Sequence, residues 1–589
     1  MMLDRTNDDF RLISYWKSLK VANFNISPTI SLFPKDEQMP LEDLGLLFFT
    51  VLILSLLLTP MSIRFSHLVG AIDHPIGRSM HLNAMPRLGG IGMVLAMLIG
   101  IALFLQFNAI TTAFITGILI ILATGVADDI HCISPKIKLL GQIIACVSFI
   151  ELSGFTITSV GDIFALGEIT FSGPFAYVIT LLTMLTIINA FNLSDGLDGL
   201  AAGIIAIACL FLGMHALGAE AWLGFALIIT LMGAVLGFLK FNSHPAKLFM
   251  GDTGSLMLGF SIIAISLILI NSEPGEIRPV SIFAVLAMPI LDLFWVMTSR
   301  IMQGKSPVNA DKTHLHHRLI AIGLPHSAVV SVLYTWVIIL GLLGIVDDNV
   351  PEYLQLLSIF LLTGLFYFIL TLFERKKIRI PFNATTINQN LNINNLTTRL
   401  LGRSMRILPY VIIAGLSLPI LTCSVIPESF GKLAMAMFFF VAVAFPWRDY
   451  HERLNSVYAI LYLCGFFTLF VWNVSTYNSF DPSNYTYIFS LILLIWAFLK
   501  IKFKSHHEVF LTSSFELLLI FISWFIPYAI LPALEVPDSI LYAAKLACLG
   551  AIPLLIAMKL IIKAQPHRNL KFSIGIMLIL CLISIKSLW

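Results

Sequence analysis

Apolar residues recur along the chain in runs of about membrane-spanning length, separated by polar segments. Eleven runs lie at residues 44–60, 88–106, 110–126, 139–152, 175–191, 200–217, 221–239, 255–270, 280–299, 328–345 and 353–373. Seven more lie at 407–425, 431–445, 456–472, 485–497, 509–531, 541–562 and 572–585. The pattern predicts an all-α, polytopic integral membrane protein with about 18 transmembrane helices, 11 in a core and 7 beyond it.

A polar segment separates these two sets of apolar runs. We therefore expect an extracytoplasmic N-terminal segment at 1–43, a membrane core at 44–373, a cytoplasmic linker at 374–406 and a C-terminal membrane domain at 407–589. The role of the last part is not indicated. With 58% hydrophobic and only 12% charged residues, the composition is far too apolar for a soluble protein. The seven cysteines are scattered and indicate neither a disulfide framework nor a Cys-based metal site.

The positive charges of the core gather in alternate loops. Those after the odd-numbered runs carry Arg64, Arg78, Arg87, Lys136, Lys138, Lys240, Lys247, Arg300, Lys305, Lys312 and Arg318, whereas the other loops carry Arg278 and almost nothing else. By the positive-inside rule the first set of loops is cytoplasmic. We therefore expect a multi-pass protein of a bacterial (inner) cell membrane with these loops on the cytoplasmic side.

The stretch at residues 189–203, NAFNLSDGLDGLAAG, is unusually polar for the end of an apolar run. It places Asn192, Asp195 and Asp198 within seven residues, and a helical turn would put the two aspartates on one face. Carboxylates beside a bilayer are costly unless something binds them, and hard oxygen ligands suit Mg²⁺ shared with a substrate phosphate. The alternative is a polar helix cap, because Asn and Asp favour such positions. This stretch alone does not separate the two interpretations.

The other unusual polar clusters of the core also fall in loops predicted to be cytoplasmic. They contain Arg87, Asp128, Asp129, Asn242, Asp252, His314, His316, His317 and Arg318. We therefore expect one cytoplasmic site assembled from five loops. The alternatives are a helix cap for Asp252 and membrane anchoring for the two arginines. A zinc site is disfavoured because no Cys or Glu stands near the histidines at ligand spacing, so we expect them to bind phosphate by hydrogen bonds.

This combination of groups indicates a class of reaction. Several carboxylates, a divalent cation and basic side chains at the lipid boundary suit phosphoryl transfer between a nucleotide diphosphate and a lipid phosphate. No P-loop is present, which disfavours ATP-driven transport. An ion-coupled transporter is the hypothesis from another class, but broken helices or inverted repeats that would favour it are not evident.

Five motifs, in order, resemble those of the polyprenyl-phosphate N-acetylhexosamine-1-phosphate transferases. They are PRLGG at 86–90, the pair Asp128-Asp129, NAFNLSDGLDG at 189–199, FNSHPAKLFMGDTGS at 241–255 and HLHH at 314–317. In that family a polyprenyl phosphate attacks the β-phosphate of a UDP-amino sugar, which yields a polyprenyl-diphosphate sugar and UMP. The resemblance covers residues 44–373 and implies a Mg-dependent glycosyl-1-phosphate transferase, with Mn²⁺ as the alternative metal.

The resemblance also implies roles for individual residues. Asn192 and Asp252 would hold the metal with Asp195 close by, and Asp198 and Asn242 would lie at the uridine. Asp128 and Asp129 would orient or deprotonate the lipid phosphate. The remaining predicted substrate-binding residues are Arg87, His314, His316, His317 and Arg318.

The chain departs from the family pattern at two places. Cys132 stands where many family members have a third aspartate, and the seven C-terminal runs have no counterpart in the family core. The HxHH spacing is similar to that of the family members that use UDP-N-acetylglucosamine or related sugars for surface polysaccharides, so the resemblance implies the initiation of a polysaccharide such as lipopolysaccharide. Phospho-N-acetylmuramoyl-pentapeptide transfer is the alternative. Expected partners are a UDP-N-acetylhexosamine, undecaprenyl (polyprenyl) phosphate, membrane lipid and a second copy of the chain in a homodimer, with no nucleic acid.

Overall fold

The computed structural model describes most of the chain, in several stretches. These are residues 41–73, 84–272, 277–306, 313–345, 350–377, 395–423, 426–444, 462, 464–475, 483–503, 514–534, 536–564 and 569–588. The predicted N-terminal segment at 1–43 falls almost wholly outside them, as does the middle of the predicted linker. The division into four parts therefore stays a prediction.

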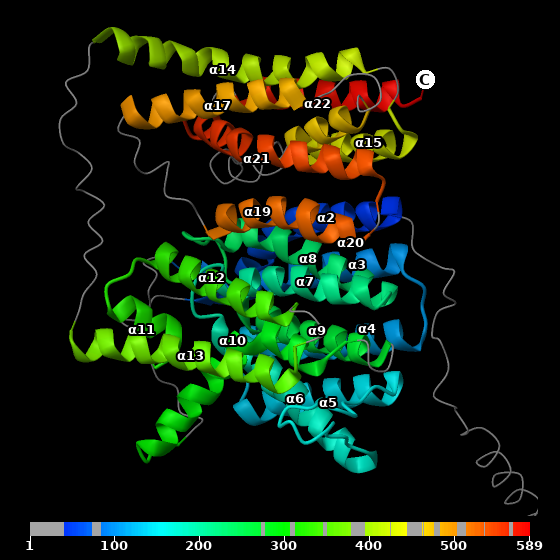
Figure 1. Ribbon diagram of the computed structural model, residues 1–589, viewed down its shortest axis with the longest axis vertical. Coiled ribbons are helices and arrows are strands. Elements are labelled where there is room, and N and C mark those ends of the chain that lie inside the picture. Colours follow the sequence, from blue (N-terminus) through cyan, green and yellow to red (C-terminus); the bar gives the residue numbers. More distant parts are fainter. Residues whose placement is uncertain are drawn as a thin grey trace, which may run out of the picture. The chain divides into compact units, whose positions relative to one another are not determined.

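The core region consists of helices that coincide with the predicted apolar runs (Figure 1). They are α2 (Leu41–Val69), α3 (Gly89–Phe104), α4 (Ala109–His131), α5 (Pro135–Ser153), α6 (Gly173–Ser194), α7 (Leu200–Gly218), α8 (Trp222–Asn242), α9 (Gly251–Ser272), α10 (Pro279–Met302), α12 (His326–Gly344) and α13 (Glu352–Arg375). The short helix α11 (Leu315–Ala321) precedes α12. The all-α, polytopic prediction is confirmed.

Most of these helices are long and apolar enough to cross a bilayer. Among the described residues ten helices meet this condition, and seven shorter apolar helices accompany them. Helix α5 belongs to neither group, although a predicted run covers it, because its 19 residues include Lys136, Lys138 and Glu151. The chain is therefore a multi-pass membrane protein, and α5 differs from its long apolar helices by the charges in its first and last turns.

Helix α9 is the centre of the core. It contacts α3, α4, α6, α7 and α8, and 94% of its most apolar 18-residue window is buried. Glycines allow this close packing, since a methyl group at Gly125 of α4 would overlap the backbone of Thr253 in α9. The N-terminus of α9 is thereby held against the C-terminal end of α4.

A short backbone link brings the PRLGG segment to the same place. Strands β1 (Ile72–Asp73) and β2 (Met85–Pro86) pair in antiparallel fashion, with Ile72 opposite Pro86. The carbonyl of Pro86 then accepts a hydrogen bond from the backbone N–H of Phe249 at 2.8 Å, and Gly89 donates to the carbonyl of Phe249 at 3.1 Å. The start of α3 and the start of α9 are therefore joined through main-chain hydrogen bonds.

The C-terminal region contains α14 (Asn395–Thr422), α15 (Glu428–Ala444), α17 (Ser483–Phe503), α19 (Ser514–Phe525), the π-helix η1 (Ile526–Ile530), α20 (Leu531–Ala533), α21 (Asp538–Ala564) and α22 (Asn569–Lys586). Lys586 donates from Nζ to the carbonyls of Ile420, Leu421 and Cys423 at 2.7–3.0 Å, which satisfies the end of α14. Phe525 packs edge-on against Phe211 of α7 at 5.2 Å between ring centroids. The two regions are thus in contact at this point.

The contact between α4 and α9 yields a stability prediction. Replacing Gly125 by Ala should lower the free energy of unfolding by about 1–3 kcal/mol, because the added methyl group forces the two backbones apart. Gly364→Ala in α13 is the matched control, since nothing lies within 4 Å of its Cβ position, and it should stabilise by roughly 0.5–1 kcal/mol. Thermal unfolding of the purified proteins in detergent measures both. Equal melting temperatures for the two variants would contradict the close packing.

Candidate active site

A buried carboxylate at the end of α4 caps the N-terminus of α9. Asp129 accepts the backbone N–H of Asp252 on Oδ1 at 2.9 Å, and on Oδ2 the backbone N–H and the hydroxyl of Thr253 at 2.9 and 2.6 Å. These bonds satisfy donors that a helix start leaves unpaired, and the negative charge suits the helix dipole. Both oxygens of Asp129 are occupied by the protein itself. Asp129 therefore positions Asp252, and its predicted role on the lipid phosphate stays a prediction.

Asp128, the neighbour of Asp129, belongs to a charged cluster formed by four helices. Lys138 of α5 places its Nζ 2.6 Å from Asp252 Oδ1 and 3.3 Å from Asp128 Oδ2. The amide of Asn192 donates to Asp252 Oδ1 and to Ser255 Oγ, both at 2.7 Å, and its oxygen accepts from Lys138 Nζ at 3.2 Å. Three of the predicted site residues are therefore brought together around one point.

Asp195 lies next to this cluster at the C-terminal end of α6. Burial raises the pKa of its carboxyl group well above the ordinary range, and the negative charges of Asp252, Asp129 and Asp198 raise it further. Its carboxylate has no hydrogen-bond or ion-pair partner among the described residues. A cation bound among these carboxylates would favour its charged form.

Asn242 connects two loops of the site. Its side chain is 2% exposed, accepts the backbone N–H of Gly199 on Oδ1 at 2.9 Å and donates from Nδ2 to the carbonyl of Leu248 at 3.0 Å. Both ends of the amide are used, and Gly199 has a φ of 78° that suits glycine. Asn242 therefore holds the DGLDG loop (residues 195–199) against the segment that leads into α9, and its predicted contact with the uridine stays a prediction.

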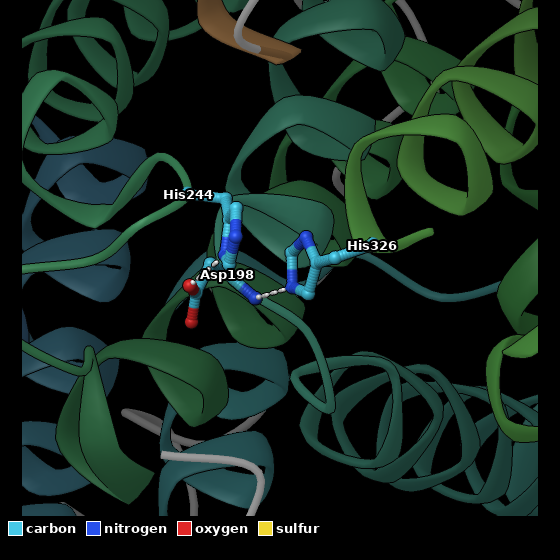
Figure 2. A group of neighbouring side chains, drawn as sticks. All are labelled: Asp198, His244 and His326. Atoms are coloured by element: carbon cyan, nitrogen blue, oxygen red, sulfur yellow. Dashed lines mark hydrogen bonds and ion pairs between the residues drawn. The ribbon is translucent and has the colours of Figure 1, made fainter. Parts of the chain in front are cut away.

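Asp198 lies between two histidines from separate segments (Figure 2). Its Oδ2 accepts from His244 Nδ1 at 2.8 Å and from the backbone N–H of Ala246 at 3.1 Å, and its own backbone N–H donates to His326 Nε2 at 3.1 Å. Burial alone would raise the pKa of Asp198, but these hydrogen bonds and the nearby histidines lower it below the ordinary value.

The same three side chains offer ligand atoms within 4.8 Å of one another, as a metal site would. The two imidazole rings, however, are stacked, with centroids 4.1 Å apart and planes inclined by 19°. Nitrogen lone pairs lie in the ring plane, so an ion shared by two nearly parallel rings would sit outside both planes. The lone pair of His326 Nε2 is also used by the Asp198 N–H. The group therefore supports the DGLDG loop in this arrangement and is not a preformed metal centre.

The HLHH motif forms the start of α11 and is positioned by Asp292 of α10. Asp292 pairs with His314 Nδ1 through Oδ2 at 2.9 Å, and its Oδ1 accepts from the N–H of Leu315 at 3.0 Å and the hydroxyl of Tyr367 at 2.7 Å. A carboxylate on one imidazole nitrogen orients the ring and leaves the other nitrogen for a ligand. Asp292 thus fixes both the helix start and the first histidine.

The rings of the other two histidines, His316 and His317, lie next to one another, and His316 is close to the DGLDG loop. The ring of His316 is 4.2 Å from that of His317 and 5.9 Å from that of His314, and a methyl group at Gly196 would overlap it. Burial, followed by the positive charge that His317 would carry, lowers the pKa of His316 to about 3. His316 is therefore neutral at pH 7 and has one N–H to donate.

The two predicted arginines have different surroundings. Arg318 donates to both carboxylate oxygens of Glu374 at 2.9 and 2.7 Å and to Thr371 at 2.9 Å. Its guanidinium therefore binds α13, and its predicted role in substrate binding stays a prediction. Arg87 pairs with Asp73 at 3.2 Å, and its side chain is 39% exposed at the edge of the site. Arg87 therefore remains a candidate substrate-binding residue.

Sequence reasoning missed two residues of this site. Lys138 counted only as a charge that indicates orientation, although it contacts the predicted metal ligands directly. Asp292 lies within the apolar run at 280–299 and is 6% exposed. A lone carboxylate inside a membrane-spanning run is costly, and this signal would have found it.

Comparisons with known proteins identify relatives of this chain. Residues 110–270 match glycosyl transferase family 4. A Bacillus subtilis (strain 168) protein, probable undecaprenyl-phosphate N-acetylglucosaminyl 1-phosphate transferase, is 36% identical over 54% of this chain and 88% of its own length. A decaprenyl-phosphate N-acetylglucosaminephosphotransferase of Mycobacterium tuberculosis (strain ATCC 25618 / H37Rv) is 32% identical over 51% and 81%. An undecaprenyl-phosphate alpha-N-acetylglucosaminyl 1-phosphate transferase of Escherichia coli (strain K12) is 29% identical over 51% and 83%.

The opposite pKa directions of Asp195 and Asp198 predict opposite effects on stability. Asp195→Asn should raise the melting temperature in EDTA at pH 7, because it removes a charge that the fold disfavours. Asp198→Asn should lower it, because the ionised carboxylate stabilises the fold above its unfolded pKa, and this contribution is lost as the pH falls through the folded pKa. Thermal unfolding between pH 3 and 8 tests both, and two shifts of the same sign would contradict the assignment.

Proposed function

Because this chain belongs to glycosyl transferase family 4, we propose that it transfers an N-acetylhexosamine-1-phosphate from a UDP-sugar to undecaprenyl (polyprenyl) phosphate. The products are a lipid-diphosphate sugar and UMP. One observation carries the proposal: oxygens of Asp128, Asn192 and Asp252, from three helices, surround one cationic point at the helix ends. Such a set is suited to a divalent cation that neutralises a diphosphate.

The proposed sugar is N-acetylglucosamine. The names of the Bacillus, Mycobacterium and Escherichia relatives all contain this sugar and a polyprenyl phosphate. The HLHH spacing of the chain favours the same donor. The reaction would then initiate a cell-surface polysaccharide such as lipopolysaccharide. The muramoyl-pentapeptide transfer and the ion-coupled transporter are not favoured by these similarities.

Mg²⁺ is the proposed cofactor, and the residues present fit it. Two carboxylates and an amide oxygen are hard ligands of the kind that Mg²⁺ prefers, and they could share the ion with a substrate phosphate. Asp252 and Asn192 would hold the ion, with Asp128 and Asp195 beside it. Bound Mg²⁺, or Mn²⁺ as the alternative, would supply neutralisation of the charge on the diphosphate and on the leaving UMP.

The remaining groups would position the reactants. Asp292 orients the ring of His314 through Nδ1, which would leave Nε2 for a contact with the substrate. Neutral His316 would donate a single hydrogen bond beside it. Arg87 at the rim would add positive charge for the donor, and Asp128 would orient or deprotonate the lipid phosphate. This arrangement acts by charge stabilisation and positioning, which suits a phosphoryl transfer.

The proposed location is a bacterial inner membrane with the site on the cytoplasmic side. The support is the placement of Lys and Arg in the loops that carry the site. We also propose that the chain forms a homodimer.

The transferase proposal is tested by Asp252. Asp252→Asn should lower UMP release from UDP-N-acetylglucosamine and undecaprenyl phosphate by about 10³-fold or more, because a charged metal ligand becomes a neutral amide. Asp538→Asn, at an exposed position in the first turn of α21, is the control and should retain wild-type turnover. UMP release by the wild type only with UDP-N-acetylmuramoyl-pentapeptide would favour the alternative donor. Near-normal turnover of Asp252→Asn would remove this residue from the metal site.

The orientation is tested by labelling single cysteines in a Cys132→Ser background, because Cys132 is an exposed thiol. The cysteines replace Gly167 and Gly304, which are both exposed. An impermeant thiol reagent added to intact spheroplasts should label position 167 and leave position 304 unlabelled until the membrane is opened. The reverse pattern would place the site on the outer side.

A further inference from the structure

Lys138 provides a cation at the point where the proposed metal would bind. Its Nζ lies 2.6 Å from Asp252 Oδ1, 3.3 Å from Asp128 Oδ2 and 3.2 Å from the amide oxygen of Asn192. These three oxygens come from α9, α4 and α6, whereas the lysine comes from α5. One ammonium group therefore holds the complete set of oxygens proposed for Mg²⁺.

The surroundings of Lys138 explain why it occupies this point. Its side chain is 17% exposed, and those of Asp128 and Asp252 are 12% and 28% exposed. Two carboxylates this close to one another repel each other when both are charged. The ammonium compensates this repulsion with hydrogen bonds to charged groups, which are stronger than those between neutral groups. Lys138 thus stabilises the ligand set in the absence of a metal ion.

We propose that Mg²⁺ binds by displacing the Lys138 ammonium from these oxygens, so that the lysine is the exchangeable counterion of the metal site. The ammonium donates to the same lone pairs that a metal needs, and two cations at this spacing repel each other. The inference rests on the proposed function for the identity of the metal. It requires no change of backbone, because the lysine head is carried on a flexible four-carbon stem.

The displaced ammonium group would be able to bind another anion. It remains attached to the first turn of α5, within reach of the cluster, and its preferred new partners are anionic oxygens. The phosphate oxygens of a metal-bound diphosphate or of the lipid acceptor have this character. Metal binding would in this way convert Lys138 from a counterion of the protein into a phosphate-binding group.

Mg²⁺ binding without substrate tests the exchange. The full-length protein is purified in detergent, and its affinity for Mg²⁺ is measured by isothermal titration calorimetry and by the rise in melting temperature with Mg²⁺ concentration. Lys138→Met should bind Mg²⁺ about tenfold more tightly than the wild type, since no ammonium competes. Its melting temperature in EDTA should be lower, because the carboxylates then repel each other without compensation.

Two further variants complete the experiment. Lys136→Met, two positions earlier on an exposed face of α5, is the matched control and should leave Mg²⁺ affinity unchanged. Lys138→Gln replaces the charge with a polar group if the Met variant does not fold, and it should also tighten binding. Unchanged or weaker Mg²⁺ binding by the folded Lys138 variants, or no binding by any protein, would overturn the proposal.

The test is separable from the proposed transferase activity. Tighter Mg²⁺ binding by Lys138→Met together with no UMP release by the wild type would retain the exchange and reject the transferase. UMP release by the wild type with unchanged metal affinity in the variant would do the opposite. If both hold, Lys138→Met should also have lower turnover at saturating Mg²⁺, because the phosphate contact is lost.

Discussion

The bonds between Asp129 and the start of α9 are the constraint on which the site depends. α9 contacts five other core helices, and its first residues carry the aspartate proposed to hold the metal. A buried carboxylate is costly unless donors surround it, and the N-terminus of α9 supplies three. In return the carboxylate fixes the direction of Asp252. The same hydrogen bonds therefore join α4 to α9 and position Asp252.

Other polar side chains of the site also bind to the backbone while they position a neighbouring segment. Asp292 satisfies the start of α11 while it orients His314, and Asn242 closes the DGLDG loop with both ends of its amide. In a lipid environment each polar group needs a partner, because water is scarce. The helix ends meet at one level, so their unpaired groups and the charged side chains satisfy one another. Function is concentrated where the fold already requires polar residues.

Apolar periodicity predicted the helices well, because spanning length is a strong physical demand. The convergence of five loops was also predictable from charge placement. Partners that are distant in sequence could not be predicted. Glu374 pairs with Arg318 from 56 residues away, and Lys138 of α5 contacts Asp252 of α9. The sequence does not show which polar side chains are already paired with other groups of the protein. Arg318 and Asn242 are paired within the protein in this way, whereas the roles that the resemblance implies for Asp252 and His316 stay predictions.

The pairing of Arg318 with Glu374 joins two helices that are distant in sequence. Glu374 lies in the last turn of α13 and holds the guanidinium of Arg318 in α11 with both carboxylate oxygens. Since α11 also carries His316 and His317, the helix that presents these histidines is held at its C-terminal half by the end of α13. Shortening α13 by its last turn would therefore loosen the histidine helix without touching any histidine.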